Sequence, residues 1–427
     1  MNISKQATIN IGTIGHVAHG KSTLVKAISG VVTTKHSKEM EKNITIQLGY
    51  ANAKIYKCDM CPSPICYKTF GSKQSDLIKC TNDGCESYLR LVRHISFVDC
   101  PGHEYLTATM LTGTSVMDAV LLIIAGNETC PQPQTIEHLA AIELMKLKKL
   151  IIVQNKVDLI NEQQATENYI QILKFIRGTV AEGSPIIPIS AQYGYNIDLL
   201  CEHIVNHVPV PVRNLNINPQ MMIIRSFDIN KPGTFIKDIK GGIAGGSITQ
   251  GIFKIGDKIE IKPGIIIQES PGIFRVETIY STIETVFAET NQLEYAIPGG
   301  LIGMGTNIDP SICRSDRLVG HLIGLEDQLP KVFIEIEITF CLLNKLLGAK
   351  DNNEKIDKLS KGESLLINVS SSSVGGTIIA INKDLAILQL SKPICCAEND
   401  KISISRRIDR VWRLIGWGLI LHGTKII

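Results

Sequence analysis

The sequence predicts an α/β domain with a parallel sheet, followed by two smaller β-barrel domains. In the first half of the chain, short apolar runs alternate with helical stretches whose apolar residues recur at i, i+3 and i+4. This alternation is typical of a parallel sheet covered by helices. The segment HVPVPVRNLNINPQ (207–220) then breaks all periodicity. Beyond it, turn signals recur about every ten residues and the apolar pattern has period two, which favours small barrels.

The expected elements follow from these patterns in order. Buried strands are expected at HISFVDC (94–100), AVLLIIAG (119–126), KLIIVQN (149–155) and PIIPIS (185–190). Helices are expected at TIEHLAAIELMKLK (135–148) and ENYIQILKFIRGTV (167–180). FKIGDKIEIK (253–262) alternates apolar and polar residues, as a strand with one buried face does. A chain of 427 residues is too long for one ordinary core, so we expect domains at 1–213, 214–328 and 329–427.

Composition excludes several classes of protein. Charged residues make up 20% of the chain and apolar ones 44%, a globular balance rather than a disordered one. No apolar run approaches the ~20 residues that span a bilayer, and the first residues, MNISKQATINIG, lack the features of a signal peptide. We therefore expect a cytoplasmic protein without a membrane partner. The net charge of +3 is weak, so a nucleic-acid partner would need a local patch.

A phosphate-binding loop is predicted at GHVAHGKS (15–22). It follows the β-prone run INIGTI and opens the helical stretch TLVKAIS, which is the context that the motif requires. Glycines allow the backbone N–H groups to face phosphates, a lysine adds a point charge, and a serine hydroxyl can ligate magnesium. The plain alternative is a glycine turn before a helix. The predicted nucleotide-binding residues of this loop are Gly15, Ala18, His19, Gly20, Lys21, Ser22 and Thr23.

Three further motifs follow at predicted strand ends. DCPG (99–102) places Asp99 where a carboxylate can hold magnesium through water, and Gly102 where a backbone amide can meet a γ-phosphate. A carboxylate at Asp158 of NKVD can accept both N–H groups of the guanine edge, which adenine lacks. An isolated NKVD would be an ordinary helix cap, but four motifs in this order predict a guanine-nucleotide switch domain that binds GTP or GDP with Mg²⁺. The base-binding residues expected are Asn155, Lys156, Val157, Asp158, Ser190, Ala191 and Gln192.

These motifs resemble a known family. GHVAHGKST, DCPGHE and NKVD before glycine-rich barrels are similar to the translational GTPases related to elongation factor Tu. YANAKIYKC, LVRHISFVDCPGHEYL, IAGNETCPQPQTIEHLAAIE and WRLIGWG resemble, more closely, the gamma subunits of eukaryotic translation initiation factor 2. The resemblance runs almost end to end and implies an α/β P-loop GTPase domain followed by two β-barrel domains.

The resemblance also implies function and partners. It implies a GTP-dependent carrier that brings methionyl initiator tRNA to the small ribosomal subunit, as the core of a heterotrimer with alpha and beta subunits. It implies that GTPase-activating and nucleotide-exchange factors act on the chain. By position, Thr45 in KNITIQ would ligate magnesium, and His103 would orient the attacking water with Lys21 on the phosphates. Ala18 replaces an aspartate of elongation factor Tu, so we expect slow GTP hydrolysis by the chain alone.

Other functions remain as alternatives. One is an elongator-type or selenocysteine-specific tRNA carrier, which the cysteine-rich insertion and the missing aspartate disfavour. Another is a nucleotide-stabilised assembly scaffold that does not cycle. The intact phosphate loop, Thr45 and His103 argue against a dead site.

Five of the twelve cysteines lie between residues 58 and 85, in an insertion at about 55–90. Clustered cysteines in a reducing compartment bind metal more often than they form disulfides, and structural zinc takes four thiolates as two short-spaced pairs. We favour Cys61, Cys66, Cys80 and Cys85, because CPSPIC is the more similar to the zinc-knuckle-like insertion of the gamma subunits. Cys58, in CDMC, offers an alternative first pair with tighter spacing. A reduced loop without metal is the plain alternative.

Overall fold

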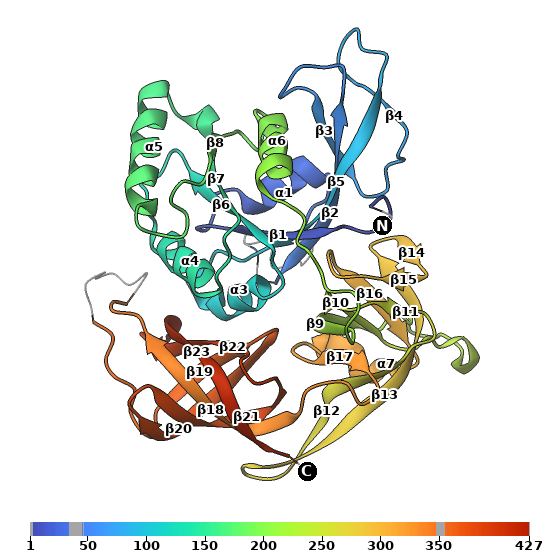
Figure 1. Ribbon diagram of the computed structural model, residues 1–427, viewed down its shortest axis with the longest axis vertical. Helices are drawn as coiled ribbons and strands as arrows, with labels where there is room; N and C mark the ends of the chain where they lie inside the picture. Colours follow the sequence, from blue (N-terminus) through green and yellow to red (C-terminus); the bar gives the residue numbers. More distant parts are fainter. Residues whose placement is uncertain (1–2, 34–44, 46, 347–354, 427) are drawn as a thin grey trace. The chain divides into compact units, whose positions relative to one another are not determined.

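The computed structural model describes residues 3–33, 45, 47–346 and 355–426 (Figure 1). These residues divide into two units that meet in the sequence between Pro211 and Val212.

The first unit is built on a sheet whose strand order is β3-β2-β5-β1-β6-β7-β8, with β4 paired to β5. Neighbours from β5 to β8 pair in parallel, whereas β2, β3 and β4 are antiparallel to their neighbours. Every residue of β1, β6 and β7 is buried, as expected for central parallel strands with helices on both faces. The strands are β1 (Ile9–Ile14), β2 (Gly49–Cys58), β3 (Tyr67–Gly71), β4 (Ile78–Lys79), β5 (Tyr88–Asp99), β6 (Ala119–Ala125), β7 (Leu150–Asn155) and β8 (Ile186–Pro188).

Helices cover this sheet, and local sequence signals mark several of their ends. Pro133 begins α4, and Asn161 and Gln164 form a reciprocal capping box at the start of α5. Apolar side chains of α1 and α6 join the same core cluster as the sheet. The helices are α1 (Lys21–Ser29), α3 (Thr107–Thr114), α4 (Pro133–Leu144), α5 (Glu162–Ile176) and α6 (Ile197–His207), with short 3₁₀ turns η1 (Glu104–Leu106) and η2 (Val157–Leu159).

The cysteine-rich segment forms a small extension of the antiparallel edge of the sheet. Backbone hydrogen bonds close it at both ends, from Cys58 N to Cys66 O (2.8 Å) and from Cys80 N to Ser87 O (2.8 Å). The extension contacts α6, where the Ser63 hydroxyl donates to the Glu202 carboxylate.

The second unit contains two closed rings of strands. In the first ring the strand order is β12-β17-β9-β10-β16-β13, and pairing of β12 with β13 closes it. β14 extends β13, and β11 pairs with β15. The elements are β9 (Gln220–Phe227), β10 (Ile243–Gln250), β11 (Phe253–Lys254), β12 (Lys258–Ser270), β13 (Ile273–Ala288), β14 (Asn291–Leu293), β15 (Tyr295–Ala296), β16 (Ile302–Thr306), β17 (Leu322–Leu325), η3 (Ile236–Asp238), α7 (Pro310–Cys313) and η4 (Arg314–Asp316).

The second ring is a closed barrel of order β18-β21-β20-β19-β22-β23. Its strands are β18 (Val332–Leu342), β19 (Ser364–Val369), β20 (Ser372–Asn382), β21 (Leu385–Cys395), β22 (Lys401–Ile408) and β23 (Val411–Lys425). The predicted fold class, an α/β domain followed by two barrels, is confirmed. Among the described residues, no helix has the length and apolar character needed to cross a bilayer.

Candidate nucleotide-binding site

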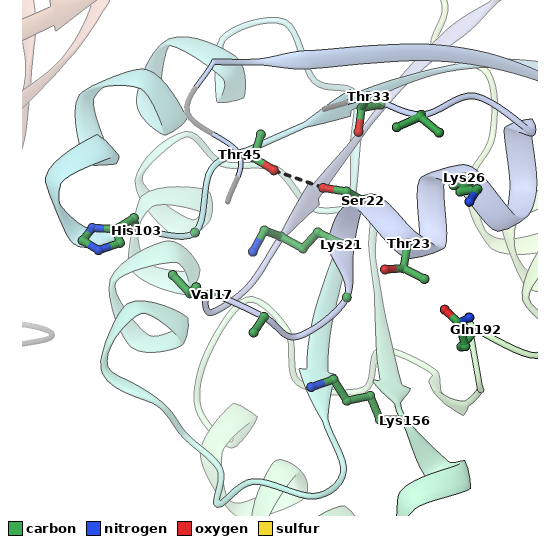
Figure 2. Close-up of a pocket in the computed structure, with 14 residues that line it drawn as sticks. Val17, Lys21, Ser22, Thr23, Lys26, Thr33, Thr45, His103, Lys156 and Gln192 are labelled. Atoms are coloured by element: carbon green, nitrogen blue, oxygen red, sulfur yellow. Dashed lines mark hydrogen bonds between the residues drawn. The ribbon is translucent and has the colours of Figure 1, made fainter. Parts of the chain in front are cut away.

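A pocket of about 450 Å³ lies in the first unit, around the loop between β1 and α1 (Figure 2). Figure 2 shows Lys21 pointing into its middle, with Thr45 and Ser22 on one side and Lys156 and Gln192 on another. Its lining residues are Val17, Ala18, Gly20, Lys21, Ser22, Thr23, Lys26, Val32, Thr33, Thr45, Gly102, His103, Lys156 and Gln192. Sequence reasoning missed Val17, Lys26, Val32 and Thr33, because none of them lies at a fixed position of a motif that we used.

Two glycines are required by close approaches to neighbouring groups. Gly20 has φ +93°, and a Cβ there would lie 2.3 Å from the Asn155 side-chain nitrogen. A Cβ at Gly102 would lie 2.4 Å from Lys21 Nζ and 2.8 Å from the Gly15 carbonyl oxygen. The absence of side chains therefore lets the DCPG loop and the NKVD motif at the end of β7 approach the phosphate-loop motif.

Lys21 is held by the backbone of its own loop. Its Nζ donates to the carbonyl oxygens of Gly15 (3.0 Å) and His16 (2.7 Å), and the side chain is only 6% exposed. Burial lowers the pKa of the ammonium to about 8, against the opposing effect of Asp99. A bound phosphate would pair its negative charge with this buried ammonium and so stabilise the charged form of Lys21.

Hydroxyl and carboxylate groups meet beside Lys21. Ser22 Oγ and Thr45 Oγ1 lie 3.0 Å apart. The Asp99 carboxylate is fully buried and accepts from the hydroxyls of Thr13 (2.9 Å) and Thr33 (2.6 Å). Hard oxygen ligands of this kind fit Mg²⁺, which keeps several waters of its own in nucleotide sites. The donor set is therefore suitable for a nucleotide-bound magnesium ion.

Asn155 joins the phosphate end of the site to the base end. Its side-chain nitrogen donates to the His19 carbonyl (2.9 Å), and its side-chain oxygen accepts from Ala191 N (3.0 Å). Lys156 lines the pocket with a left-handed backbone, φ +63°. Three motifs that are distant in sequence are thus tied through one amide.

The other predicted base-binding residues surround this amide. Val157 and Asp158 lie on η2, where Asp158 is exposed. Ser190 is buried, and its hydroxyl accepts from Tyr193 N at 3.4 Å. Gln192 lines the pocket, whereas Asp158 is not among the lining residues.

Two buried histidines stabilise the phosphate-loop motif through hydrogen bonds that the sequence did not predict. His138, on α4, accepts from Gly15 N through Nδ1 (3.2 Å). His19, fully buried, contacts the Ile123 carbonyl through Nδ1 (3.0 Å) and the Glu128 carboxylate through Nε2 (3.3 Å). Burial lowers the pKa of His19 to about 4 and that of His138 to about 3, so both rings are neutral near pH 7. His138 belongs to no motif, and its burial on the apolar face of a helix was the only available signal.

His103 lies at the edge of the pocket and caps η1. Its Nδ1 accepts from Tyr105 N at 3.5 Å. The two rings are stacked, with centroids 5.2 Å apart and an angle of 20° between planes. His103 therefore caps a helical turn and also borders the nucleotide pocket.

The cysteine cluster contains Cys58 rather than Cys66. The thiols of Cys58, Cys61, Cys80 and Cys85 all lie within 4.8 Å of one another, with Cys58–Cys85 and Cys61–Cys80 Sγ separations of 3.7 Å. A zinc–sulfur bond of about 2.3 Å gives a tetrahedral edge of about 3.8 Å, so this set fits zinc.

Cys66, which we favoured as a ligand from the sequence, is not part of this group of four. The residue is 1% exposed, and its backbone pairs with Cys58 N and Pro62 O to close the turn.

Two different family models match the two ends of the chain. The family model described as Elongation factor Tu GTP binding domain matches residues 6–210. The family model described as Initiation factor eIF2 gamma, C terminal, matches residues 334–420.

Two curated relatives are similar over nearly the whole chain. Eukaryotic translation initiation factor 2 subunit 3 of Drosophila melanogaster is 58% identical over 430 residues, which covers 99% of this chain and 90% of the relative. Eukaryotic translation initiation factor 2 subunit gamma of Schizosaccharomyces pombe is 56% identical over 429 residues, which covers 99% of this chain and 96% of the relative.

Solved structures share the fold at low identity. A bacterial selenocysteine-specific elongation factor, EF-Sec, has a TM-score of 0.71 and 20% identity, covering 98% of this chain and 59% of that chain. The elongation factor SelB of Methanococcus maripaludis, in complex with the GTP analogue GPPNHP, has a TM-score of 0.69 and 19% identity, covering 99% of this chain and 80% of that chain. At this identity the likeness shows the fold alone.

Proposed function

We infer the function from one premise: this chain belongs to the gamma subunits of eukaryotic translation initiation factor 2. It is a translational GTPase that acts in initiation. The observation that carries this conclusion is the similarity over 99% of the chain to two initiation-factor subunits, combined with a pocket built from all the nucleotide motifs.

The finer function that we propose is delivery of methionyl initiator tRNA to the small ribosomal subunit, controlled by GTP. In this proposal the chain is the core of a heterotrimer with alpha and beta subunits, works in the cytoplasm, and is served by GTPase-activating and nucleotide-exchange factors. The names of the two relatives, each a numbered or lettered subunit of one factor, support a multi-subunit assembly.

We assign the parts of the pocket to the parts of the nucleotide. Lys21 and the surrounding backbone N–H groups take the phosphates, and the Ser22 and Thr45 hydroxyls are suited to Mg²⁺, with Asp99 behind. Asp158 and the 190–192 loop take guanine. The bound Mg²⁺ would neutralise charge on the phosphates.

His103 is assigned to orienting the water that attacks GTP, because it borders the pocket beside Gly102 and Lys21. Ala18 contributes no carboxylate near the metal, so hydrolysis by the chain alone is expected to be slow. A single-turnover rate above about one per second, a typical enzyme rate, would contradict this expectation.

We propose that Cys58, Cys61, Cys80 and Cys85 hold one structural zinc ion. The thiol separations support this assignment, and the zinc would stabilise the extension of the sheet edge.

The alternative carriers and the scaffold are not favoured. The two elongation factors among the solved structures are 19–20% identical, whereas the initiation-factor relatives are 56–58% identical.

The test is the affinity for initiator tRNA in two nucleotide states. Methionyl initiator tRNA should bind more tightly with a non-hydrolysable GTP analogue than with GDP, by roughly 5- to 150-fold for a coupling of ~1–3 kcal/mol. Elongator methionyl-tRNA is the control and should bind weakly in both states. Equal affinities for initiator tRNA with the analogue and with GDP would contradict the proposed switch.

A further inference from the structure

Tyr105 contacts His103 in two different ways. The backbone N–H of Tyr105 donates to Nδ1 of the imidazole at 3.5 Å. The phenol ring of the same residue is stacked on the imidazole, with centroids 5.2 Å apart and planes 20° from parallel. One residue thus contacts both an edge and a face of the histidine ring.

The backbone contact favours one tautomer of the imidazole. A neutral imidazole whose Nδ1 accepts a hydrogen bond carries its proton on Nε2. Nε2 is therefore the nitrogen that can reach a water, and within the described part of the chain it makes no hydrogen bond. Nε2 can contact a water beside the phosphates only when the imidazole ring is turned toward them.

In this structure His103 borders the pocket, but its ring points away from the place of the phosphates. Figure 2 shows the imidazole of His103 pointing away from Lys21, whose ammonium marks the place of the phosphates. Rotation of the imidazole toward that place separates it from the phenol. The stacking energy of the aromatic pair therefore opposes the rotation.

We propose that Tyr105 is a positioning residue that holds His103 in its outward orientation and so slows GTP hydrolysis by the isolated chain. This inference rests on the proposed role of His103 in hydrolysis. The Tyr105 side chain is 64% exposed, so a protein that binds over it can separate the phenol from the imidazole. Such a partner would speed hydrolysis without contacting the nucleotide.

The experiment compares single-turnover GTP hydrolysis by the full chain and three variants. Tyr105→Leu removes the aromatic face but keeps apolar bulk, and it should raise the rate by about 2- to 12-fold, the factor that corresponds to an aromatic pair. Tyr105→Phe keeps the stacked ring and should leave the rate at the parent value. Tyr280→Leu, which changes an exposed tyrosine of the second unit, is the matched control and should also leave the hydrolysis rate at the parent value. GDP affinity should be the same in all four proteins.

A spectroscopic measurement tests the contact apart from the rate. In NMR spectra, the ring protons of His103 should show a ring-current shift in the parent and in Tyr105→Phe, and lose it in Tyr105→Leu. His103→Gln, alone and combined with Tyr105→Leu, should hydrolyse GTP slowly and at equal rates. If His103→Gln hydrolyses GTP as fast as the parent, the proposed role of His103 fails, and this inference with it. If His103→Gln is slow but Tyr105→Leu is no faster than the parent, only the inference about Tyr105 is overturned.

Discussion

The nucleotide pocket and the cysteine cluster lie in the same unit but are held together in different ways. Groups at the pocket are fixed by hydrogen bonds within the protein, such as those from Asn155 to His19 and from Ala191 to Asn155. The four clustered cysteines come from one short extension, and two of their thiols, Cys61 and Cys85, are only half-buried.

This difference separates a preformed site from a site that needs its ligand. The pocket is built on a buried sheet and on the N-terminus of α1, so the folding of the whole unit fixes its shape. The extension has a five-residue strand and a two-residue strand, too little structure to be stable alone. We therefore expect substitutions in the pocket to act on nucleotide binding, and substitutions in the cluster to act on zinc with little effect on nucleotide.

The largest effect is expected from Asp158→Asn. The carboxylate becomes an amide with one acceptor and one donor, so the preference for GTP over xanthosine triphosphate should fall by more than about 100-fold or invert. Competition binding with the two nucleotides measures this preference. Asp198→Asn, at the start of α6, is a control of the same chemistry and should leave it unchanged. An unaltered preference in Asp158→Asn would remove NKVD from the base site.

Asn155→Ala should weaken both GDP and GTP binding by about 10- to 100-fold. The substitution removes the amide that holds the His19 carbonyl and the Ala191 N–H in their binding positions, so nucleotide binding must reorder both segments at a cost of ~1–3 kcal/mol. Fluorescent-nucleotide titration gives the affinities. Asn161→Ala removes the cap of α5 and should lower the free energy of unfolding by ~1 kcal/mol while affinity stays constant. Equal losses of affinity in the two variants would indicate general destabilisation instead.

A smaller, pH-dependent effect is expected at Lys21. Its pKa is lowered to about 8 in the nucleotide-free protein, and bound phosphates raise it, so nucleotide binding should take up protons. The uptake should be about 0.1 proton at pH 7 and about 0.5 at pH 8. Calorimetry in buffers of different ionisation enthalpy measures it. Lys21→Arg keeps a permanent charge and should abolish the uptake; uptake that persists in this variant would assign the proton to another group.

The smallest effect on nucleotide is expected from the double substitution Cys80→Ser and Cys85→Ser. Elemental analysis should give about one zinc per parent chain and none per double variant, because two of four thiolates are lost. GDP affinity should change by less than about 3-fold. Cys66→Ala, a buried cysteine outside the cluster, is the control and should retain zinc. Loss of zinc in the control, or loss of GDP binding in the double variant, would contradict the separation of the two sites.

Much of the pocket could be predicted because its motifs require fixed backbone positions. Gly20 and Gly102 stand where close approaches exclude a Cβ, and Lys21 follows from the same loop. Continuous apolar runs likewise predicted the central strands, since each is buried on both faces. Residues that act on the pocket from other elements, such as His138 and Thr33, belong to no pattern in the sequence.

The cysteines proposed to bind zinc could not be chosen from their spacing alone. Both CDMC and CPSPIC are compatible with a zinc pair, and the choice depends on where β2 ends and how the chain turns after it. β2 continues to Cys58, and the following turn returns the chain so that the Cys66 carbonyl pairs with Cys58 N. Tertiary packing leaves Cys66 outside the group formed by Cys58, Cys61, Cys80 and Cys85, which the spacing of cysteines does not encode.

The amide of Asn155 also has a consequence for the kinetics of nucleotide release. Because it links the His19 carbonyl to the 190–192 loop, displacement of that loop draws the amide away from the phosphate-binding backbone. Guanine and phosphate contacts should therefore be lost in one step rather than in sequence. An exchange factor would need to bind only the exposed tyrosines beside the loop, Tyr193 and Tyr195. Its binding would then lower the activation barrier for release of the phosphates, at the opposite end of the nucleotide.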